Sequence, residues 1–339
     1  MQIAVFAYSR QGCLTAGRIG DLLRGEQVRK YTLEKYLDEG FSPLEKPSAD
    51  FYGAMFRSCD ALIFVSSCGI AVRQIAPFVR DKKTDPAVIV VDELGKFTIS
   101  LLSGHIGGAN ELAGTIAGGL QSIPVVTTAT DINRKFSVDA WAARNGYSIS
   151  DMKAAKAVSA EILERTVPMK CCYPVAGALP AGVAAGDRGP VGILISPKEE
   201  EPFDVTLRLI PKVLHLGIGC RRGTPAEVIR QGVEEVLKAH NIDRRAVRCA
   251  ASIDLKADEQ GLLAFCREEG LPVSFYSAKE LLKLPGEFSK SKFVDSITGV
   301  DCVCERAAMV GAEKLIIRKT VSCGITVAVS EENLEVHFG

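Results

Sequence analysis

Three loops of small residues decide the fold: SSCGIAVR at residues 66–73, SGHIGGANE at 103–111 and TTATD at 127–131. Each loop follows an apolar run that is typical of a buried β-strand, and most of them lead into a helical pattern. In an open α/β sheet, ligands bind beyond the carboxyl ends of the strands, where glycines let the backbone approach closely and helix N-termini favour anions. We therefore expect an anionic small molecule to bind beside these loops.

Alternating strand and helix patterns cover the N-terminal region. Nearly all-apolar runs at 61–66, 86–91 and 123–128 predict strands of the buried parallel kind, with a helix of small residues at 106–120 between the last two. Strands joined by helices form parallel sheets with right-handed crossovers. The pattern thus predicts an open parallel-sheet α/β domain over residues 1–131.

The composition changes after this domain. Helical patterns at 136–146 and 152–165 are followed by a proline- and glycine-rich segment at 168–202, in which one short strand is predicted at 191–195. Such a composition is typical of a connector rather than of an independent core. We expect residues 132–210 to join two α/β domains.

The second α/β domain is predicted over residues 211–339. It opens with an apolar strand, after which Thr224 is expected to cap a helix whose first position is Pro225. Ser277 and Glu280 form a second capping-box pattern further along. The predicted fold class is α/β, with two open parallel-sheet α/β domains joined by a middle connector segment.

Composition limits the classes of partner and of site. Forty-one basic residues balance 41 acidic ones, so the net charge favours neither nucleic acid nor an anionic membrane surface. No apolar run has the ~20 residues of a transmembrane helix, and the N-terminus reads as a strand rather than as a signal peptide. Eleven cysteines, an odd number, indicate reduced thiols, and neither they nor the four histidines have zinc-site spacing. We expect a cytoplasmic protein without a metal site of its own.

His105 and Glu111 are the candidate catalytic pair. His105 follows a predicted strand and can titrate near neutrality, and Glu111 is a carboxylate base near the start of the next helix, so the pair can deliver water to an ester carbonyl. The amides of Gly107 and Gly108 are then placed to stabilise the oxyanion. The alternative is that His105 caps a turn and Glu111 bonds local backbone groups. The pattern leaves both interpretations open.

Other residues of the loops are predicted to bind the ligand. Arg221 and Arg222 at a helix entrance suit carboxylate or phosphate oxygens, with a solvated loop as the alternative. The full glycine spacing of a dinucleotide site is absent after Gly219, which disfavours a nucleotide-dependent oxidoreductase. The remaining candidates for substrate binding are Ser67, Gly69, Gly107, Gly108, Thr128, Asp131 and Thr224.

Longer motifs extend from these loops toward the C-terminus. They read SCGIAVR at 67–73, DELGKF at 92–97, LSGHIGGANELA at 102–113, TTATDIN at 127–133, FSVDAW at 136–141, GIGCRRGTP at 217–225, DLKADE at 254–259 and GITVA at 324–328. Taken together and in this order, they resemble the CbiG family of cobalamin biosynthesis over essentially the whole chain.

The resemblance implies one specific hydrolysis, that of cobalt-precorrin-5A. In that substrate a cobalt-bearing tetrapyrrole carries a δ-lactone between its ring A acetate and the methylated meso carbon. The implied enzyme opens the lactone, releases the two-carbon unit as acetaldehyde and gives cobalt-precorrin-5B, so it is a hydrolase acting on a carbon–carbon bond. It needs no cofactor, because the substrate carries the cobalt.

The implied partners are the tetrapyrrole and other enzymes of the corrin pathway. A polycarboxylate substrate agrees with loops that favour anions, and we expect it to bind between the two domains. The alternative function is that of a carrier, which binds corrinoid intermediates without catalysing a step.

Overall fold

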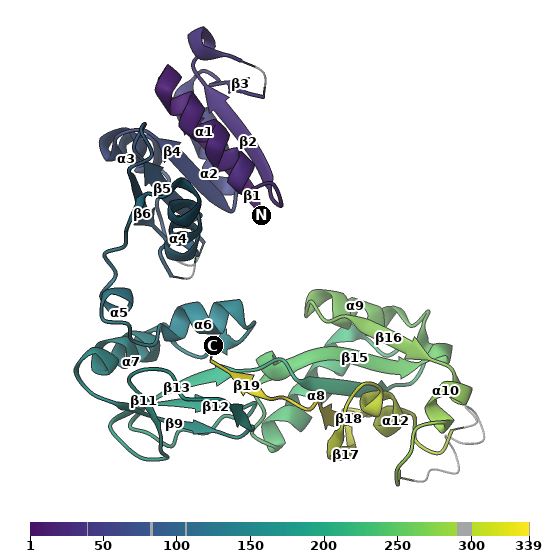
Figure 1. Cartoon of the computed structure of the whole chain (residues 1–339). Coiled ribbons are helices and arrows are strands. Elements are labelled where there is room, and N and C mark those ends of the chain that lie inside the picture. The colour runs from purple at the N-terminus through teal and green to yellow at the C-terminus, as the bar shows by residue number, and fades with distance from the viewer. Residues whose placement is uncertain (39, 82–83, 106, 290–299, 339) are drawn as a thin grey trace. The chain divides into compact units, whose positions relative to one another are not determined.

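The computed structural model describes residues 1–338 except 39, 82–83, 106 and 290–299 (Figure 1). Its contacts divide the chain into two units, Met1–Ala140 and Trp141–Gly339. Within the described ranges, no helix is long and apolar enough to cross a membrane.

The first unit is built around a seven-stranded sheet in the order β3-β2-β1-β4-β5-β6-β7. Its strands are β1 (Gln2–Ala7), β2 (Gln27–Thr32), β3 (Ser42–Pro43), β4 (Ala61–Val65), β5 (Ala87–Val91), β6 (Phe97–Leu102) and β7 (Ile123–Val125). Its helices are α1 (Arg10–Leu22), η1 (Glu34–Tyr36), α2 (Ser48–Ser58), α3 (Cys68–Ile75), α4 (Ala109–Leu120) and α5 (Ala129–Ile132). Helices α1 and α4 pack on one face of the sheet and α2 and α3 on the other, so β1, β4 and β5 are buried on both faces. The α/β prediction is confirmed for this unit.

The β5–β6 turn reverses the chain and decides where the later loops lie. Asp92 accepts hydrogen bonds from the amides of Leu94, Lys96 and Phe97 at 2.9, 2.8 and 2.6 Å, and Gly95 takes a φ of 69°. β6 consequently runs antiparallel to β5, since a parallel connection needs about a dozen residues. β7 is parallel to β6, so both strands end at the edge opposite to the ends of β1, β4 and β5. The sheet is therefore mainly, but not wholly, parallel.

The middle segment forms a sheet of its own rather than the predicted connector. Its strands lie in the order β11-β9-β12-β13-β8, and only β8 is antiparallel to its neighbour. The elements here are α6 (Val138–Arg144), β8 (Ser148–Ile149), α7 (Met152–Glu164), β9 (Val167–Cys171), β10 (Val175–Ala176), β11 (Val183–Ala185), β12 (Val191–Ile195) and β13 (Val205–Ile210). Helix α7 covers the sheet with the buried side chains of Val158 and Ile162. The prolines and glycines mark loops between short strands.

The end of the chain returns to the middle segment, where it forms a separate two-stranded sheet. β19 (Val336–His337) pairs with β10, and the indole Nε1 of Trp141 donates to His337 O at 2.9 Å. This return explains why the middle segment belongs to the second unit.

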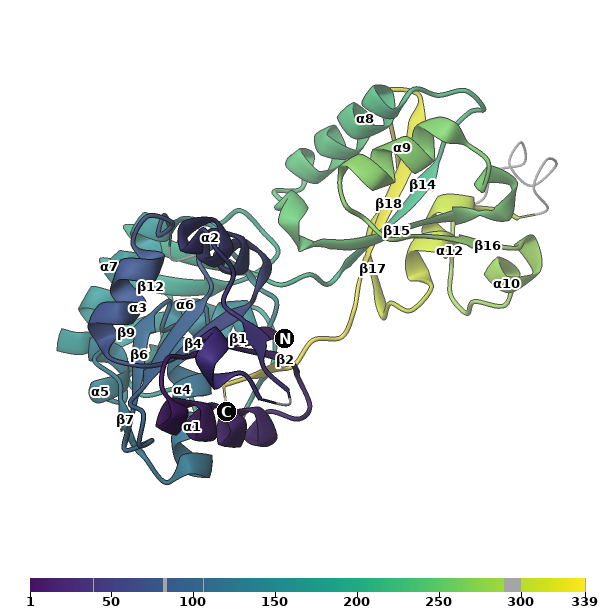
Figure 2. The same cartoon turned by 90° about the horizontal axis from the view of Figure 1, so that it is seen from above.

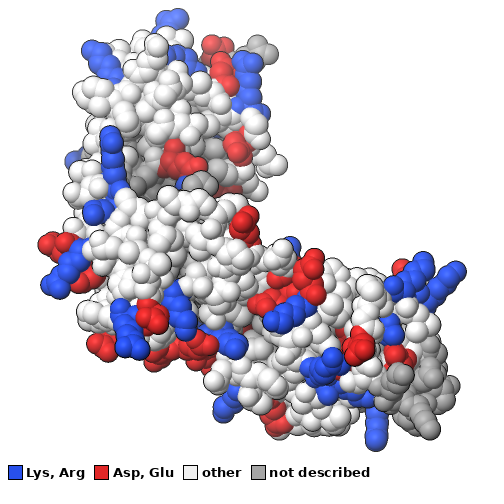
Figure 3. Space-filling model, turned by 60° about the horizontal axis from the view of Figure 1, so that its bottom comes forward, with Lys and Arg blue, Asp and Glu red and all other residues white. Residues whose placement is uncertain are grey.

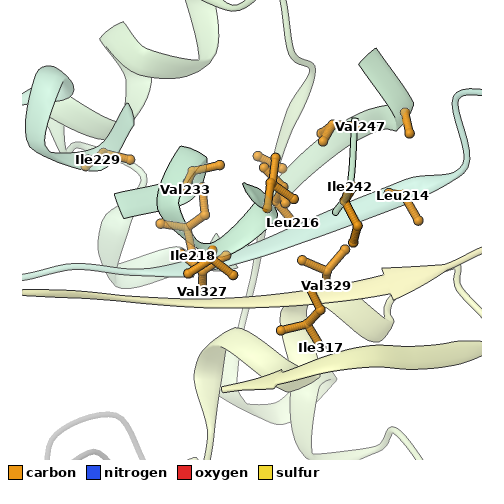
Figure 4. Packing of buried hydrophobic residues seen from close by; sticks show 14 of the residues in the cluster. Leu214, Leu216, Ile218, Ile229, Val233, Ile242, Val247, Ile317, Val327 and Val329 are labelled. Atoms are coloured by element: carbon orange, nitrogen blue, oxygen red, sulfur yellow. The ribbon is translucent and has the colours of Figure 1, made fainter. Parts of the chain in front are cut away.

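The last sheet has the strand order β16-β15-β14-β18-β17, in which β18 is antiparallel to both of its neighbours. Its elements are β14 (Leu214–Gly219), α8 (Ala226–Ala239), η2 (Arg244–Ala246), β15 (Val247–Ile253), η3 (Asp254–Lys256), α9 (Gln260–Glu268), β16 (Val273–Tyr276), α10 (Ala278–Leu282), α12 (Val303–Met309), β17 (Lys314–Ser322) and β18 (Ile325–Glu331). Helices α8 and α9 lie on one face, and α10 and α12 on the other (Figure 2). Leu216, Ile218 and Val233 pack with Val327 and Val329 in the core under α8 (Figure 4).

The two predicted helix starts of this domain have different outcomes. The capping box is confirmed, because Ser277 Oγ accepts from Glu280 N and the Glu280 carboxylate accepts from Ser277 N at 2.8 Å. Helix α8 begins one residue later than predicted, because Pro225 has an extended ψ of 149°. The hydroxyl of Thr224 therefore does not cap the helix and donates to Arg221 O at 2.8 Å.

Candidate active site

The loops that follow β6 and β7 form the candidate active site. Because these strands are parallel neighbours, His105 after β6 and Thr130 after β7 lie at the same edge of the sheet. Asn110, at the start of α4, donates from Nδ2 to Thr128 Oγ1 at 3.1 Å. This hydrogen bond joins the two loops.

Glycines shape the loop that carries His105. A Cβ on Gly107 would lie 2.4 Å from Cβ of Ser103, and one on Gly104 would lie 2.6 Å from Oδ1 of Asn110, so larger residues would displace the loop. Ser103 has a φ of 57°, and its buried hydroxyl has no hydrogen-bond partner among the described residues. Backbone strain of this kind is often found at functional sites.

Hydrogen bonds within the loop occupy some of its amides. Gly108 N donates to His105 O at 3.0 Å, and Ala109 N donates to Ser103 O at 3.1 Å. The prediction that the Gly108 amide stabilises the oxyanion is therefore not supported, because the N–H of Gly108 already donates to His105 O. For Gly107 that role stays a prediction.

His105 lies between a hydroxyl and a carboxylate. Its Nε2 is 3.1 Å from Thr130 Oγ1, and its Nδ1 is 3.6 Å from Asp139 Oδ1. The His105 side chain is 18% exposed and that of Asp139 is 8% exposed. Low exposure strengthens the electrostatic interaction between the ring and the carboxylate, because little water screens it.

Local hydrogen bonds fix the orientation of Asp139. Its Oδ1 accepts from Ser137 Oγ at 3.1 Å and from Ala140 N at 3.0 Å. A carboxylate held beside Nδ1 favours the tautomer of His105 with its proton on that nitrogen. Nε2 is then the basic nitrogen, and it accepts a hydrogen bond from the Thr130 hydroxyl.

The sequence pattern singled out neither Thr130 nor Asp139 as a site residue. Thr130 is 25 residues from His105, so only the pairing of β7 with β6 brings them together. Asp139 lies in the buried sequence Val138-Asp139-Ala140-Trp141. An acidic residue in such an apolar run is the signal that could have identified it.

The remaining predicted residues of this edge lie around His105 and Thr130. Glu111 is exposed on the first turn of α4, and Thr128 is bonded to Asn110 as described above. Asp131 belongs to α5, but its side chain lies outside the described part of the structure. The predicted catalytic pairing of Glu111 with His105 stays a prediction.

Ser67 and Gly69 lie at the other edge of the sheet. They follow β4, whose end faces away from the ends of β6 and β7, because β6 is antiparallel to β5. The expectation that all three small-residue loops meet at one edge is therefore wrong. A ligand beside His105 has the loops after β6 and β7 around it, without Ser67 and Gly69.

In the second unit, the loop after β14 holds the two predicted arginines. Arg222 donates from Nη1 and Nη2 to the two carboxylate oxygens of Asp258, both at 3.1 Å. Gly223 N donates to Glu259 Oε1 at 2.9 Å, which fixes the loop beside η3. For the Arg221 guanidinium, the described part of the chain provides no acceptor. Arg221 is thus the arginine with donors available to a ligand.

The residues that the structure describes contain no group of three or more His, Cys, Asp or Glu side chains that could hold a metal ion. Cavities of about 920 and 430 Å³ occur in the second unit, and Lys170, Tyr173 and Glu331 line the first, while Arg230 and Arg244 line the second. None of the predicted site residues lines either cavity.

Surface charge adds little to the definition of the site. Basic and acidic side chains are interspersed on the face that Figure 3 shows. This distribution agrees with the balanced composition of the chain.

Comparisons with known proteins identify relatives of both halves of the chain. The family described as "Cobalamin synthesis G N-terminal" matches residues 50–131, and "Cobalamin synthesis G C-terminus" matches residues 214–330. A protein of Priestia megaterium named cobalt-precorrin-5A hydrolase is 33% identical, over 96% of this chain and 94% of its own. A protein of the same name from Salmonella typhimurium is also 33% identical, over 96% of this chain and 97% of its own.

A solved structure also resembles part of the chain. It is that of CobE, a protein from the cobalamin (vitamin B12) biosynthetic pathway, which is 32% identical over 36% of this chain and 92% of its own, with a TM-score of 0.34.

Proposed function

The chain belongs to the CbiG family of cobalamin synthesis proteins, and from this membership we propose that it is a cobalt-precorrin-5A hydrolase. The relatives that carry this name match nearly the full length of both chains, so the proposal covers the whole protein rather than one domain. Both matched family regions, at residues 50–131 and 214–330, are present in one chain.

The proposed reaction has two parts. The enzyme opens the δ-lactone between the ring A acetate and the methylated meso carbon, and the two-carbon unit then leaves as acetaldehyde to give cobalt-precorrin-5B. The cobalt belongs to the substrate, and the residues proposed for the chemistry are acid–base groups and a hydroxyl. The two-part reaction is supported by the membership of the chain in this family.

The observation that carries the proposed site is the position of His105 between Asp139 and Thr130. Opening a lactone at neutral pH needs a base that activates the attacking oxygen and an acid that protonates the departing one. A histidine with a carboxylate beside Nδ1 can take both roles in turn, because the carboxylate stabilises the imidazolium that forms. We assign the base to His105 and the positioning of its ring to Asp139.

Glu111 is proposed as the base of the second part. Lactone opening leaves a hydroxyl on the meso carbon, and that proton must be removed before acetaldehyde can leave. Glu111 is an exposed carboxylate on the first turn of α4, and this helix begins directly after the His105 loop. Its position suits a group that meets the substrate after the lactone has opened.

We further propose that Arg221 binds a substrate carboxylate. The tetrapyrrole has acetate and propionate side chains, and a guanidinium binds such groups through charge-assisted hydrogen bonds. Thr224 holds the backbone of Arg221 through its hydroxyl, and Arg222 holds the loop through Asp258.

The test is release of acetaldehyde from cobalt-precorrin-5A by the purified full-length chain. Protein-dependent release, with a matching loss of mass from the tetrapyrrole, is the expected result. Stoichiometric binding of the tetrapyrrole without release of aldehyde would instead support the carrier function.

A further inference from the structure

Both ring nitrogens of His105 face protein groups. Nδ1 faces Asp139 at 3.6 Å, and Nε2 faces the hydroxyl of Thr130 at 3.1 Å. The basic nitrogen is therefore directed at a hydroxyl of the protein. We propose that Thr130 is the nucleophile that opens the lactone, with formation of an ester between Thr130 and the substrate; this inference rests on the proposed function.

The order of the three groups supports this assignment. A carboxylate, an imidazole and a hydroxyl in this sequence of contacts form the arrangement that activates an alcohol for attack on an acyl carbon. The arrangement is recognised by its geometry, and it recurs on unrelated folds with different chain orders. Here the histidine comes first in the chain, then the hydroxyl and then the carboxylate.

The backbone around Thr130 holds the hydroxyl in place. Thr130 lies in α5, directly after the β7 loop, and is 5% exposed. Its carbonyl accepts from Lys135 N at 2.8 Å, and Ile132 N donates to Thr128 O at 3.0 Å across the turn that contains Thr130. Threonine is β-branched, so fewer χ1 rotamers are open to its hydroxyl than to that of serine.

Ser103 also carries a hydroxyl at this edge, and its surroundings differ from those of Thr130. Its Oγ is buried and without a hydrogen-bond partner among the described side chains and backbone groups. A neutral hydroxyl is a weak nucleophile unless a base removes its proton. Thr130 has such a base at hydrogen-bond distance.

The proposed step is balanced with water as the only co-reactant. Thr130 Oγ bonds to the lactone carbonyl carbon, and its proton moves to His105 Nε2. The bond between that carbon and the ring oxygen breaks, and the departing oxygen takes the proton from His105. Water then attacks the Thr130 ester with His105 as base, which frees the acetate and restores the Thr130 hydroxyl. One water is consumed for each lactone that is opened.

The first experiment removes the hydroxyl and keeps the shape of the side chain. Thr130→Val should lower the rate of lactone opening by at least about 10³-fold, whereas Thr130→Ser should stay within about tenfold of the wild type. The matched control is Thr115→Val, because Thr115 lies exposed on α4 and its hydroxyl bonds only to Glu111 O among the described groups. The control should leave the rate unchanged.

The second experiment uses the wild-type chain, so it does not depend on whether a variant folds. The wild-type chain is mixed with cobalt-precorrin-5A, quenched in acid during the first turnover and measured as an intact protein by mass spectrometry. We expect an adduct with the mass of the substrate, located by proteolysis on the peptide that contains Thr130. Absence of the adduct, or a Thr130→Val rate above a tenth of the wild type, would overturn the proposal. Failure of the wild type to open the lactone at all would overturn the proposed function instead.

Discussion

Two histidines, one in each unit, lie beside a carboxylate in different surroundings. His215 Nδ1 is 3.1 Å from Val310 O, and its Nε2 is 2.7 Å from Glu332 Oε1. Both partners are acceptors, so both ring nitrogens must carry a proton and the ring is held as imidazolium. His105 faces a carboxylate with one nitrogen and a hydroxyl with the other.

The difference separates a structural role from a catalytic one. The ring of His215 cannot lose a proton without losing a hydrogen bond, whereas His105 can accept a proton that the Thr130 hydroxyl gives up. Two glutamates differ in a similar way. Glu305 is fully buried and accepts from Ser289 N, Ser289 Oγ and Lys319 N, each at 2.7 Å, while Glu111 is exposed. A group that the fold satisfies completely stabilises the protein, and a group with an exchangeable partner can act on a ligand.

The largest effect should come from Asp139→Asn. The amide keeps the size of the side chain but removes the charge that holds Nδ1–H of His105, so lactone opening should fall by about 10³–10⁴-fold. The measurement is the rate of lactone opening, with His105→Asn as the reference for complete loss of the base.

Circular dichroism and the melting temperature provide the control for folding of this variant. A rate within tenfold of the wild type in a folded Asp139→Asn protein would contradict the contrast between the two histidines, because the carboxylate at His105 would then serve only the fold.

Glu111→Gln should have the next largest effect, and it should affect the second part of the reaction alone. Glutamine keeps the size but accepts no proton, so acetaldehyde release should fall by about 10²-fold while the lactone still opens. Mass spectrometry of the tetrapyrrole then detects a lactone-opened intermediate that carries one added water. Equal loss of both parts would instead place Glu111 beside His105 in the first step.

The sequence was sufficient for most local elements of the fold. The predicted strand at 61–66 and the capping box at Ser277 depend on neighbouring residues only, and both are present as β4 and α10. The middle sheet was not predicted because its strands are short and lie among prolines and glycines, and because its order, β11-β9-β12-β13-β8, joins strands that are not consecutive in the chain. The proline and glycine content of such a region indicates where its loops are, but not which of its strands pair.

The candidate site was harder to predict for a similar reason. The strand direction at β6 is set by the short turn 92–96, which was too short for a crossover and could have been recognised as a hairpin. The turn places His105 at one edge and Ser67 at the other. Thr130 and Asp139 join His105 only through this topology, so neither was found from spacing in the sequence.

The two arginines of the β14 loop show the same contrast, between a group that the fold already pairs and one that it does not, in binding of the tetrapyrrole. Arg221→Ala should weaken substrate binding by roughly tenfold to hundredfold, because it removes a charge-assisted hydrogen bond to a carboxylate. Arg222→Ala should weaken it by less than about threefold, since that guanidinium is already held by Asp258. Equilibrium titration with the tetrapyrrole measures both. An equal loss in the two variants would mean that Arg222 exchanges Asp258 for the ligand.

The smallest effect concerns His215, and it appears in stability rather than in turnover. Cys249 lies opposite His215 on the neighbouring strand β15. The interaction of its side chain with the ring contributes most, the hydrogen bond to Glu332 and the charge of Glu332 add to it, and together they raise the pKa of His215 from 6.5 to about 9 against the effect of burial. A pKa raised by folding gives stability that is complete below the unfolded value of 6.5 and is lost as the pH rises through about 9. His215→Gln should lack this contribution, which is on the order of 3 kcal/mol for a pKa shift from 6.5 to about 9.

The experiment compares the free energy of unfolding of the wild type and of His215→Gln from pH 6 to pH 10 by denaturant titration. Groups that titrate in both proteins cancel in the difference, so the advantage of the wild type at low pH should shrink as His215 loses its proton. Lactone opening should stay within about twofold of the wild type at pH 7, because His215 belongs to the β14 core and its nitrogens have no exchangeable partner. A stability difference that does not change with pH would mean that the ring is neutral in the folded protein. The two histidines would then differ only in their position in the fold. The difference in protonation, in which Val310 O and Glu332 keep His215 charged, would be lost.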